Sequence, residues 1–242
     1  MSSAVIIPTY NESENIEKLS NGILALKKDV SVIIVDDNSP DGTGLIADRL
    51  AGADSAIKVI HRQGKLGLGT AYIAGFKYAL KENFEYILTM DADFSHDPER
   101  IPQLIDEAKR CDVVIGSRYI KGGDTVNWSI YRRMLSKTAN MVTKFMLRLK
   151  PNDCTSGFRC YNRNVLESLK LDTLFSSGYS FLVEVLYEAQ SMGYRIGEVP
   201  IIFNDRKRGK SKISKKEIFK GAYTIFRLSA KRLIKGRHKD VS

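Results

Sequence analysis

The sequence predicts an α/β fold in which a mostly parallel sheet is covered by helices on both faces. Short, continuous apolar runs alternate with amphipathic helical segments through the first half of the chain. Strands that are apolar on both sides are typical of parallel sheets buried between two layers of helices. The chain has 242 residues, of which 43% are hydrophobic, so it can build one domain with a full core and is not mainly disordered.

Strands and helices of the first half follow one another in strict alternation. The apolar runs predict strands at 4–9, 30–35, 57–61, 86–90 and 113–117. The segments between them predict helices at 15–28, 43–51, 69–82 and 98–110. Pro98 stands in the first turn of the last helix, where proline is tolerated.

The second half of the chain is more basic and carries longer helices. We expect a helix at 127–149, a strand at 156–161, a helix at 181–192, a strand at 195–199, a polar loop at 205–212 and a final helix at 215–235. The first and last of these helices interleave apolar residues with Lys and Arg. Such helices either pack on the sheet or lie on a membrane, and we expect a combination, partly core with an exposed apolar margin.

The charge of the chain is unevenly distributed. Residues 1–117 carry 12 basic and 18 acidic side chains, a net charge of −6, whereas residues 118–242 carry 26 and 10, a net charge of +16. A basic half of this size indicates an anionic partner: nucleic acid, anionic lipid or a phosphorylated substrate.

Several classes of protein and site are excluded by the sequence. No segment approaches the roughly 20 apolar residues that span a bilayer, and we expect no signal peptide. Cys111, Cys154 and Cys160 fit neither a disulfide framework nor a zinc site, which favours a reducing compartment. The Gly-rich segment 63–69 matches neither a P-loop nor a dinucleotide-binding motif.

Polar clusters directly follow three of the predicted strands. They are Tyr10–Glu12, Asp36–Asp37 and Asp91–Asp93. Because ligands of parallel sheets bind beyond the carboxyl ends of the strands, we expect the three clusters to meet at one edge.

The paired carboxylates Asp91 and Asp93 suit a hard cation such as Mg²⁺ or Mn²⁺, although turn or capping roles explain a short acidic motif equally well. The carboxylate of Asp37 suits a nucleoside hydroxyl or base N–H, and its alternative is a helix-capping run. Tyr10 offers a flat face for a base, and Glu12 offers an acceptor.

Six segments together resemble one family. They are IIPTYNESENI, VDDNSPDGT, GLGTAYIAGF, MDADFSHDPE, GSRY and DRKRGKSK, spread over residues 4–212. In this order they resemble the dolichyl-phosphate mannose synthases, inverting nucleotide-sugar glycosyltransferases of family 2 with the Rossmann-like GT-A fold. The resemblance implies a GT-A catalytic domain at 1–212, and we expect a membrane-proximal basic helix and tail at 213–242.

The resemblance also implies roles for individual residues. Donor-binding residues would be Pro8, Tyr10, Glu12, Val35, Asp37, Asp91, Ala92, Asp93, Arg118, Arg206 and Lys212. Mg²⁺ or Mn²⁺ would be held by Asp91 and Asp93; Ser95 matches a position that is Gln or Ser in the family and is the weakest metal ligand. Acceptor phosphate would be bound by Arg118, Arg132 and Ser136. Asp93, Arg118 and Arg132 would be the catalytic residues.

The implied reaction is inverting transfer of mannose from GDP-mannose to dolichyl (polyprenyl) phosphate. Its product, dolichyl β-D-mannosyl phosphate, is a mannose donor for protein glycosylation and GPI-type pathways. A lipid monophosphate is already anionic at neutral pH, so its oxygen attacks without a dedicated base. The protein then positions the substrates and neutralises charge. No histidine is nominated as catalytic, and we expect His96 to support the Asp91–Asp93 segment.

The resemblance places the protein at a membrane surface, with a small membrane-anchoring subunit as a candidate partner. That surface would be the cytosolic face of the endoplasmic reticulum in a eukaryote, or otherwise the cytoplasmic face of the cell membrane. The alternative reaction is that of a dolichyl-phosphate glucose synthase or another polyprenyl-phosphate glycosyltransferase using a UDP-sugar. A noncatalytic nucleotide-sugar scaffold is a further alternative. Nucleic acid is not expected as a partner, because the chain has no recognised reader motif.

Overall fold

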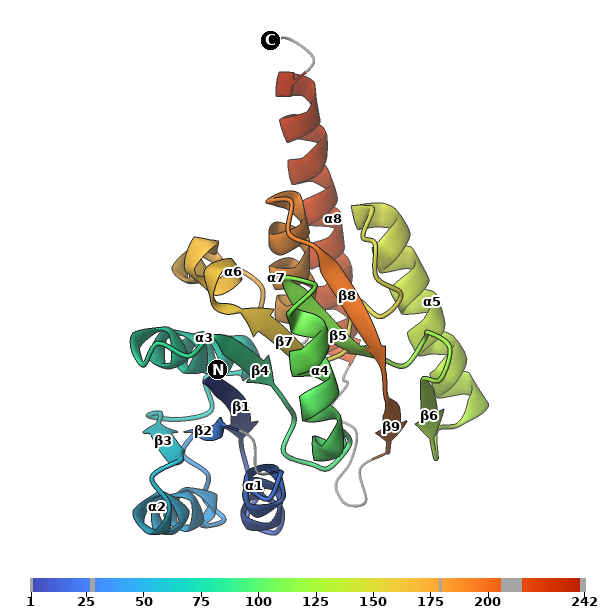
Figure 1. Cartoon of the computed structure of the whole chain (residues 1–242). Helices are drawn as coiled ribbons and strands as arrows, with labels where there is room; N and C mark the ends of the chain where they lie inside the picture. Colours follow the sequence, from blue (N-terminus) through green and yellow to red (C-terminus); the bar gives the residue numbers. More distant parts are fainter. Residues whose placement is uncertain (1, 27–28, 179, 206–214, 240–242) are drawn as a thin grey trace.

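A computed structural model describes residues 2–26, 29–178, 180–205 and 215–239 (Figure 1). Its main sheet has the strand order β3-β2-β1-β4-β7-β5-β8. The strands are β1 (Ser3–Thr9), β2 (Val30–Asp36), β3 (Ile57–His61), β4 (Tyr86–Thr89), β5 (Val113–Ser117), β7 (Arg159–Asn162) and β8 (Ile196–Pro200). All neighbours pair in parallel except β7, which runs antiparallel to both β4 and β5.

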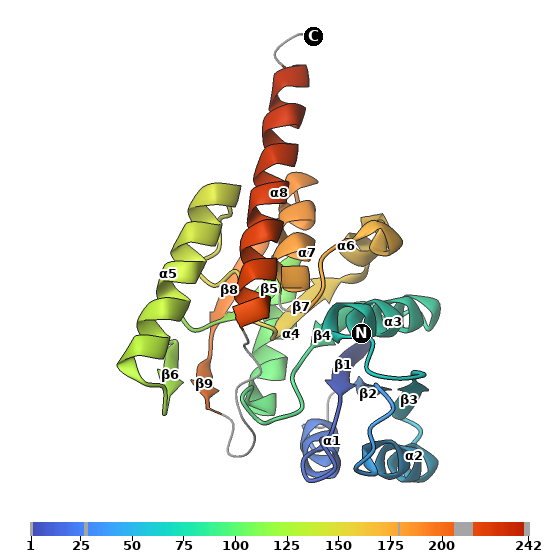
Figure 2. The same ribbon diagram turned by 180° about the vertical axis from the view of Figure 1, so that it is seen from behind.

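Helices cover both faces of this sheet, as predicted (Figures 1 and 2). One face packs against α1 (Ile16–Leu24), α2 (Thr43–Ala53) and α4 (Ile101–Ala108). The other face packs against α3 (Leu68–Lys81), α6 (Arg163–Ser168) and α7 (Ser180–Ser191). Successive residues of β1 alternate between the two cores, which explains why its sequence is continuously apolar.

Several predicted elements differ from the structure in their extent. The helix predicted at 98–110 consists of a 3₁₀ turn, η1 (Pro98–Arg100), and α4. The helix predicted at 15–28 ends at Leu24. The helix predicted at 127–149 corresponds to α5 (Ile130–Leu147), which begins after Ser129 because the Ser129 hydroxyl caps it by accepting from the Arg132 backbone N–H. The final helix, α8 (Lys215–Lys239), extends beyond the predicted end at 235.

Four short elements of the structure were not predicted from the sequence. They are α6, the 3₁₀ turn η2 (Leu171–Thr173), and the strands β6 (Asp124–Val126) and β9 (Ile202–Asn204). β6 and β9 pair in parallel as a separate two-stranded sheet. Each of these two strands is three residues long and contains exposed positions, so neither forms a clear apolar run in the sequence.

α5 and α8 lie side by side and pack on α7 and the edge of the main sheet (Figure 2). Leu147 of α5 and Leu228 of α8 belong to this third core cluster. Most other apolar side chains of α5 are exposed, so its apolar residues contribute less to the core than the sequence analysis expected. Within the described parts of the chain, no helix combines the length and the apolar character needed to cross a bilayer.

Candidate active site

The polar clusters predicted to meet do follow the ends of adjacent strands. Thr9, Asp36 and Thr89 end β1, β2 and β4, which are parallel neighbours, so the residues after them emerge at one edge of the sheet. β7 is antiparallel, so its beginning lies at the same edge, where the Thr89 hydroxyl donates to the Gly157 carbonyl at 2.7 Å. The edge therefore combines strand ends with the loop that precedes β7.

Tyr10 and Glu12 extend from β1 at this edge. The ammonium group of Lys65 lies over the Tyr10 ring, 4.0 Å from its centre, which places a cation beside the aromatic face expected to bind a base. Glu12 Oε2 accepts from the Asn15 side-chain amide at 2.9 Å. Pro8 pairs in register with Val35, whose side chain is fully buried in the core and therefore does not reach a ligand at the surface.

The two neighbouring aspartates after Val35 have different partners. Asp36 is buried and accepts from the Thr9 hydroxyl at 2.9 Å and the Ser39 hydroxyl at 2.6 Å, so it joins the end of β1 to the loop after β2. Asp37 forms a buried ion pair with Arg62 at 2.6 Å. Burial raises the pKa of Asp37 above its ordinary value, against the opposing effect of Arg62.

The Asp91–Asp93 segment forms a tight turn. Asp93 Oδ1 accepts from the Ser95 backbone N–H at 3.0 Å, and Phe94 adopts a left-handed conformation with φ of 59°. The position of a Cβ at Gly157 would be 3.6 Å from Asp91 Oδ1, so the loop before β7 passes beside this carboxylate. Ala92 between the two carboxylates is buried in the core.

The turn suits a divalent cation by the chemistry of its donors. The two carboxylates, of Asp91 and Asp93, are separated by one residue, and the buried Ser95 hydroxyl has no hydrogen-bond partner among the described residues. Within that part of the chain, no group of three or more His, Cys, Asp or Glu side chains could hold a metal. A cation held by Asp91 and Asp93 would therefore keep positions for water or phosphate oxygens, which is the usual arrangement for Mg²⁺.

His96 holds this turn through a hydrogen bond to its backbone. Its Nδ1 accepts from the Asp91 backbone N–H at 3.2 Å, and its ring stacks on Phe158. Burial lowers the pKa of His96, while Asp91 and Asp93 act in the opposite direction. A neutral ring with Nδ1 as acceptor is thus consistent with both its hydrogen bond and its burial.

Arg118 follows β5 and is held by a residue that the sequence analysis did not identify. Asp153, fully buried, accepts from Nε and Nη2 of Arg118 at 2.7 Å each and from its backbone N–H at 3.1 Å. Thr155 Oγ1 accepts a further bond from Nη2 at 2.9 Å. Burial alone would lower the pKa of Arg118 and raise that of Asp153, but their mutual attraction outweighs it, so both shifts favour the charged pair.

This pairing fixes one side of the Arg118 guanidinium. Both Nε and Nη2 are engaged, whereas no described residue accepts a hydrogen bond from Nη1. A spacing of 35 residues between Arg118 and Asp153 gave no local signal in the sequence, so only the fold brings the two together.

Arg132 and Ser136 lie one turn apart on α5, next to the loop after β5. Arg132 Nη1 donates to Asp205 at 2.7 Å, and its guanidinium lies over the Trp128 ring at 4.2 Å. The Tyr119 hydroxyl donates to Ser136 Oγ at 2.7 Å, which leaves the Ser136 proton to be donated elsewhere. Tyr119 and Trp128 were not singled out from the sequence. Arg206 and Lys212 lie outside the described residues.

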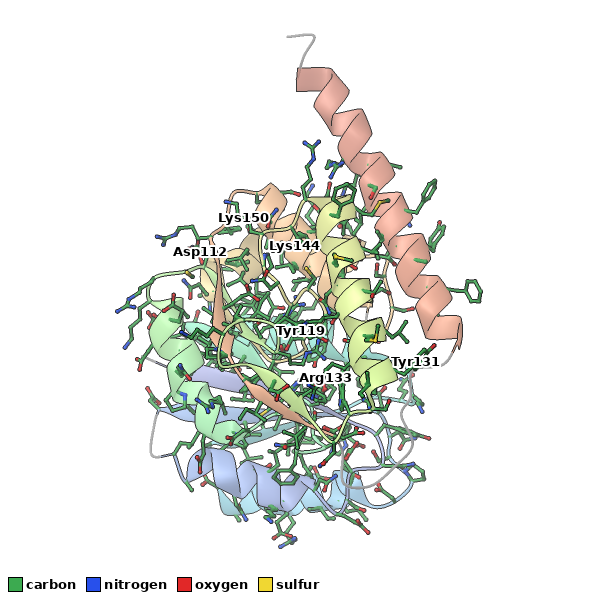
Figure 3. The ribbon with its side chains drawn as sticks, turned by 90° about the vertical axis from the view of Figure 1, so that its right-hand side faces the viewer. Asp112, Tyr119, Tyr131, Arg133, Lys144 and Lys150 are labelled. Carbon is green, nitrogen blue, oxygen red and sulfur yellow. The ribbon has the colours of Figure 1, made fainter. Side chains whose placement is uncertain are left out.

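Exposed large apolar side chains of α5 and α8 together form what we call the α5–α8 face; Figure 3 shows the side of the molecule on which both helices lie. Its residues are Ile130, Tyr131, Met134, Leu135, Met141, Val142, Phe145 and Met146 of α5 and Phe219, Tyr223 and Phe226 of α8. Phe145 is 81% exposed and Phe219 is 74% exposed. Figure 3 shows Tyr131 projecting from the beginning of α5 and Lys144 nearer its end.

Comparisons with known proteins identify the family of the chain. A family model described as glycosyl transferase family 2 matches residues 4–170. The polyprenol monophosphomannose synthase of Mycolicibacterium smegmatis is 43% identical over 223 residues, covering 91% of this chain and 84% of that protein. The undecaprenyl-phosphate mannosyltransferase of Micrococcus luteus is 43% identical over 209 residues, covering 86% of each.

A more distant structural relative supports the fold. The crystal structure of glucosyl-3-phosphoglycerate synthase from Mycobacterium tuberculosis, bound to Mn²⁺ and UDP, superposes with a TM-score of 0.67. The match covers 95% of this chain and 80% of that one at 18% identity. At this identity the likeness concerns the fold alone.

Proposed function

The chain belongs to glycosyl transferase family 2, and we propose that within this family it transfers mannose from GDP-mannose to a polyprenyl phosphate such as dolichyl phosphate, with inversion. The observation that carries the proposal is the arrangement at the sheet edge. There the carboxylate turn after β4 adjoins the loop that holds Arg118, and Arg132 and Ser136 lie beside it on α5. Relatives at 43% identity whose names specify mannose and polyprenol support the choice of substrates.

The donor half of the proposed site uses the ends of β1, β2 and β4. Tyr10 would stack on the guanine, and Glu12 and Asp37 would accept from base or ribose donors. Arg62 already neutralises Asp37 at 2.6 Å, so this carboxylate would bind the nucleoside as part of an ion pair. Arg206 and Lys212 are proposed to contact the diphosphate.

Asp91 and Asp93 fit a divalent cation, either Mg²⁺ or Mn²⁺, with the buried Ser95 hydroxyl as a weaker third donor. When bound, such a cation neutralises the diphosphate leaving group. His96 holds the backbone of Asp91 at 3.2 Å and thereby fixes the orientation of the turn.

The acceptor half uses arginine because two anions must approach each other. Arg118 presents Nη1 while Asp153 holds its other nitrogens, and Arg132 and Ser136 add further donors. A planar guanidinium binds phosphate oxygens in pairs, which suits the acceptor monophosphate. That phosphate is already ionised, so its oxygen displaces GDP from the anomeric carbon without transferring a proton to the protein. The residues contribute positioning and charge neutralisation.

The α5–α8 face is proposed to rest on the membrane that contains the acceptor. Its apolar side chains stand next to exposed basic residues such as Lys137, Arg148 and Arg227. An apolar face bordered by cations suits the interface of an anionic bilayer. The proposed location is the cytosolic or cytoplasmic surface of such a membrane, with a small anchoring subunit as a further candidate partner.

A panel of donors and acceptors tests the proposal. GDP-mannose, UDP-glucose and UDP-GlcNAc would each be incubated with dolichyl phosphate and with undecaprenyl phosphate, in the presence of Mg²⁺ or Mn²⁺. We expect a β-mannosyl lipid from GDP-mannose and none from the UDP-sugars. Transfer from a UDP-sugar alone would establish the alternative glycosyltransferase, and binding without transfer from any donor would favour a noncatalytic scaffold.

A further inference from the structure

Four aromatic rings form a row between the Asp91–Asp93 turn and the arginines of the acceptor half. Phe158 stacks on His96 with ring centres 5.1 Å apart. His96 makes an edge contact with Phe203 at 5.4 Å, and Phe203 makes another with Trp128 at 5.4 Å. We call Phe158, His96, Phe203 and Trp128 the aromatic row.

The aromatic row touches both halves of the proposed site. His96, the second ring of the row, accepts from the Asp91 backbone N–H at its Nδ1, at 3.2 Å. At the Trp128 end of the row, Arg132 lies 4.2 Å and Arg118 5.6 Å from the centre of the Trp128 ring. The row is therefore a continuous packed connection from the carboxylate turn to both arginines.

Backbone hydrogen bonds of β9 run along the same path. Phe203 is the central residue of this strand, and the next residue, Asn204, donates its backbone N–H to the Ser95 carbonyl at 3.2 Å. Asp205 then accepts from Arg132 at 2.7 Å. Three successive residues thus link the turn to the arginine side, so the row does not depend on ring contacts alone.

We propose that Trp128 and Phe203 are positioning residues that fix Arg118 and Arg132 relative to the Asp91–Asp93 turn. The assignment rests on the proposed function, which places the donor at the turn and the acceptor at the arginines. An aromatic face attracts a guanidinium without consuming its N–H donors, so the donors that Asp153, Thr155 and Asp205 do not engage remain for phosphate oxygens. Misplacement of reacting groups by about 1 Å can cost about 100-fold in rate, so the rigidity of this connection has a direct catalytic consequence.

Substitution of Trp128 separates positioning from simple packing. In Trp128→Leu, the KM for polyprenyl phosphate is expected to rise about 10-fold while the KM for GDP-mannose stays within about twofold. Trp128→Phe keeps an aromatic face and is expected to restore the acceptor KM to within about threefold of wild type. Equal behaviour of the Leu and Phe variants, or a parallel rise of both KM values, would overturn the proposal.

Fluorescence gives a readout that does not require turnover. Trp128 is the only tryptophan in the chain, so its emission reports on this site alone. Adding GDP with Mg²⁺ to the wild type is expected to change the emission, because the turn contacts Trp128 through His96 and Phe203. In Phe203→Leu the change at saturating nucleotide is expected to fall by at least about half; Phe84→Leu, at another half-buried phenylalanine, serves as the matched control.

The two experiments also distinguish failure of the inference from failure of the proposed function. If the wild type transfers no mannose to any polyprenyl phosphate, the proposed function is wrong, and the fluorescence comparison still tests the connection. A wild type that binds GDP by calorimetry but gives no fluorescence response, or an undiminished response in Phe203→Leu, rejects the aromatic row as a connection between the two halves; absence of GDP binding rejects the proposed function instead. Thermal unfolding of each variant identifies any that have simply lost their fold.

Discussion

At the site, the buried carboxylate of Asp153 determines the orientation of the Arg118 guanidinium. Asp153 has no exposed surface and uses both of its oxygens on Arg118, so the direction of that guanidinium is determined by the loop before β7. A buried ion pair of this kind gains little stability in itself, but removing one partner leaves an uncompensated charge. Its value here lies in fixing the orientation of a donor group.

Asp153→Asn is expected to destabilise the protein by about 3–5 kcal/mol at neutral pH, because Arg118 would remain buried without its counter-ion. The pKa of Asp153 is lowered from 3.8 in the folded protein, since attraction to Arg118 outweighs burial. Below pH 3.8 the unfolded chain takes up this proton first, so the contribution of Asp153 is lost as the pH falls through the folded pKa. Urea unfolding from pH 7 to pH 3 should show the deficit of the variant shrinking on acidification; a deficit that is constant with pH would contradict this.

Asp93→Ala tests the assignment of the cation. It is expected to lower metal-dependent transfer by at least about 100-fold while leaving the thermal unfolding temperature within a few degrees, because Asp93 lies in a turn outside the helices and strands that form the core. Activity would be measured against Mn²⁺ and Mg²⁺ concentration. Unchanged turnover would remove Asp93 from the metal site.

Among the helices and strands, α5 and β9 have roles that could be predicted only in part from their sequences. The residues of α5 that face the core are Asn140, Thr143 and Leu147, whereas most of its large apolar side chains face outward. Sequence periodicity identified the helix and its apolar stripe but not the direction in which the stripe points. β9 is three residues long, yet together with Asp205, which follows it, it connects the Ser95 carbonyl with Arg132.

Phe145→Glu is expected to weaken sedimentation with anionic lipid vesicles by about 10-fold, because it removes an apolar contact and adds a repelled charge. Leu45→Glu is the matched control, since Leu45 on α2 is 77% exposed but lies outside the α5–α8 face. Both variants should retain transfer to a short, detergent-soluble acceptor. Equal loss of vesicle binding in the two variants would show that the face is not the docking surface.

For the molecule as a whole, the uneven charge along the sequence corresponds to different parts of the structure. Acidic residues of the first half include the carboxylates at the strand ends, and the net charge of +16 lies in the half that contains α5 and α8. The proposed partners of that half are all anions: the donor diphosphate, the acceptor phosphate and the membrane surface. A field of this sign attracts such partners from a distance limited by salt screening.

Binding of the wild-type protein to vesicles is therefore expected to fall as salt rises from about 0.05 to 0.5 M, and to be stronger on anionic than on zwitterionic lipid. A residual, salt-resistant part would reflect the apolar residues of the α5–α8 face. Sedimentation at several salt concentrations measures both parts. Salt-independent binding would contradict the electrostatic component, and RNA or DNA binding that stays tight at physiological salt would count against an exclusively lipid-directed surface.

The sequence by itself determined the sheet, its helical layers and the place of the carboxylate clusters. Continuous apolar runs require burial on both faces, and parallel strands bring their carboxyl ends to one edge, so Asp36–Asp37 and Asp91–Asp93 could be placed there without coordinates. These are consequences of local pattern and of a general rule of topology. The resemblance to a known family added candidate residues such as Arg118, Arg132 and Ser136.

Only the tertiary structure decided which groups meet across the chain. Arg118 and Asp153 are 35 residues apart, and Arg132 and Asp205 are 73 apart, so neither pairing has a local signature. The antiparallel direction of β7 brings Gly157 beside Asp91, and no apolar pattern specifies strand direction. Which side of α5 faces the core likewise depends on the elements that pack at the edge of the sheet. Long-range contacts are fixed by packing of the complete fold, which is why the pairs that orient the site residues emerge only from it.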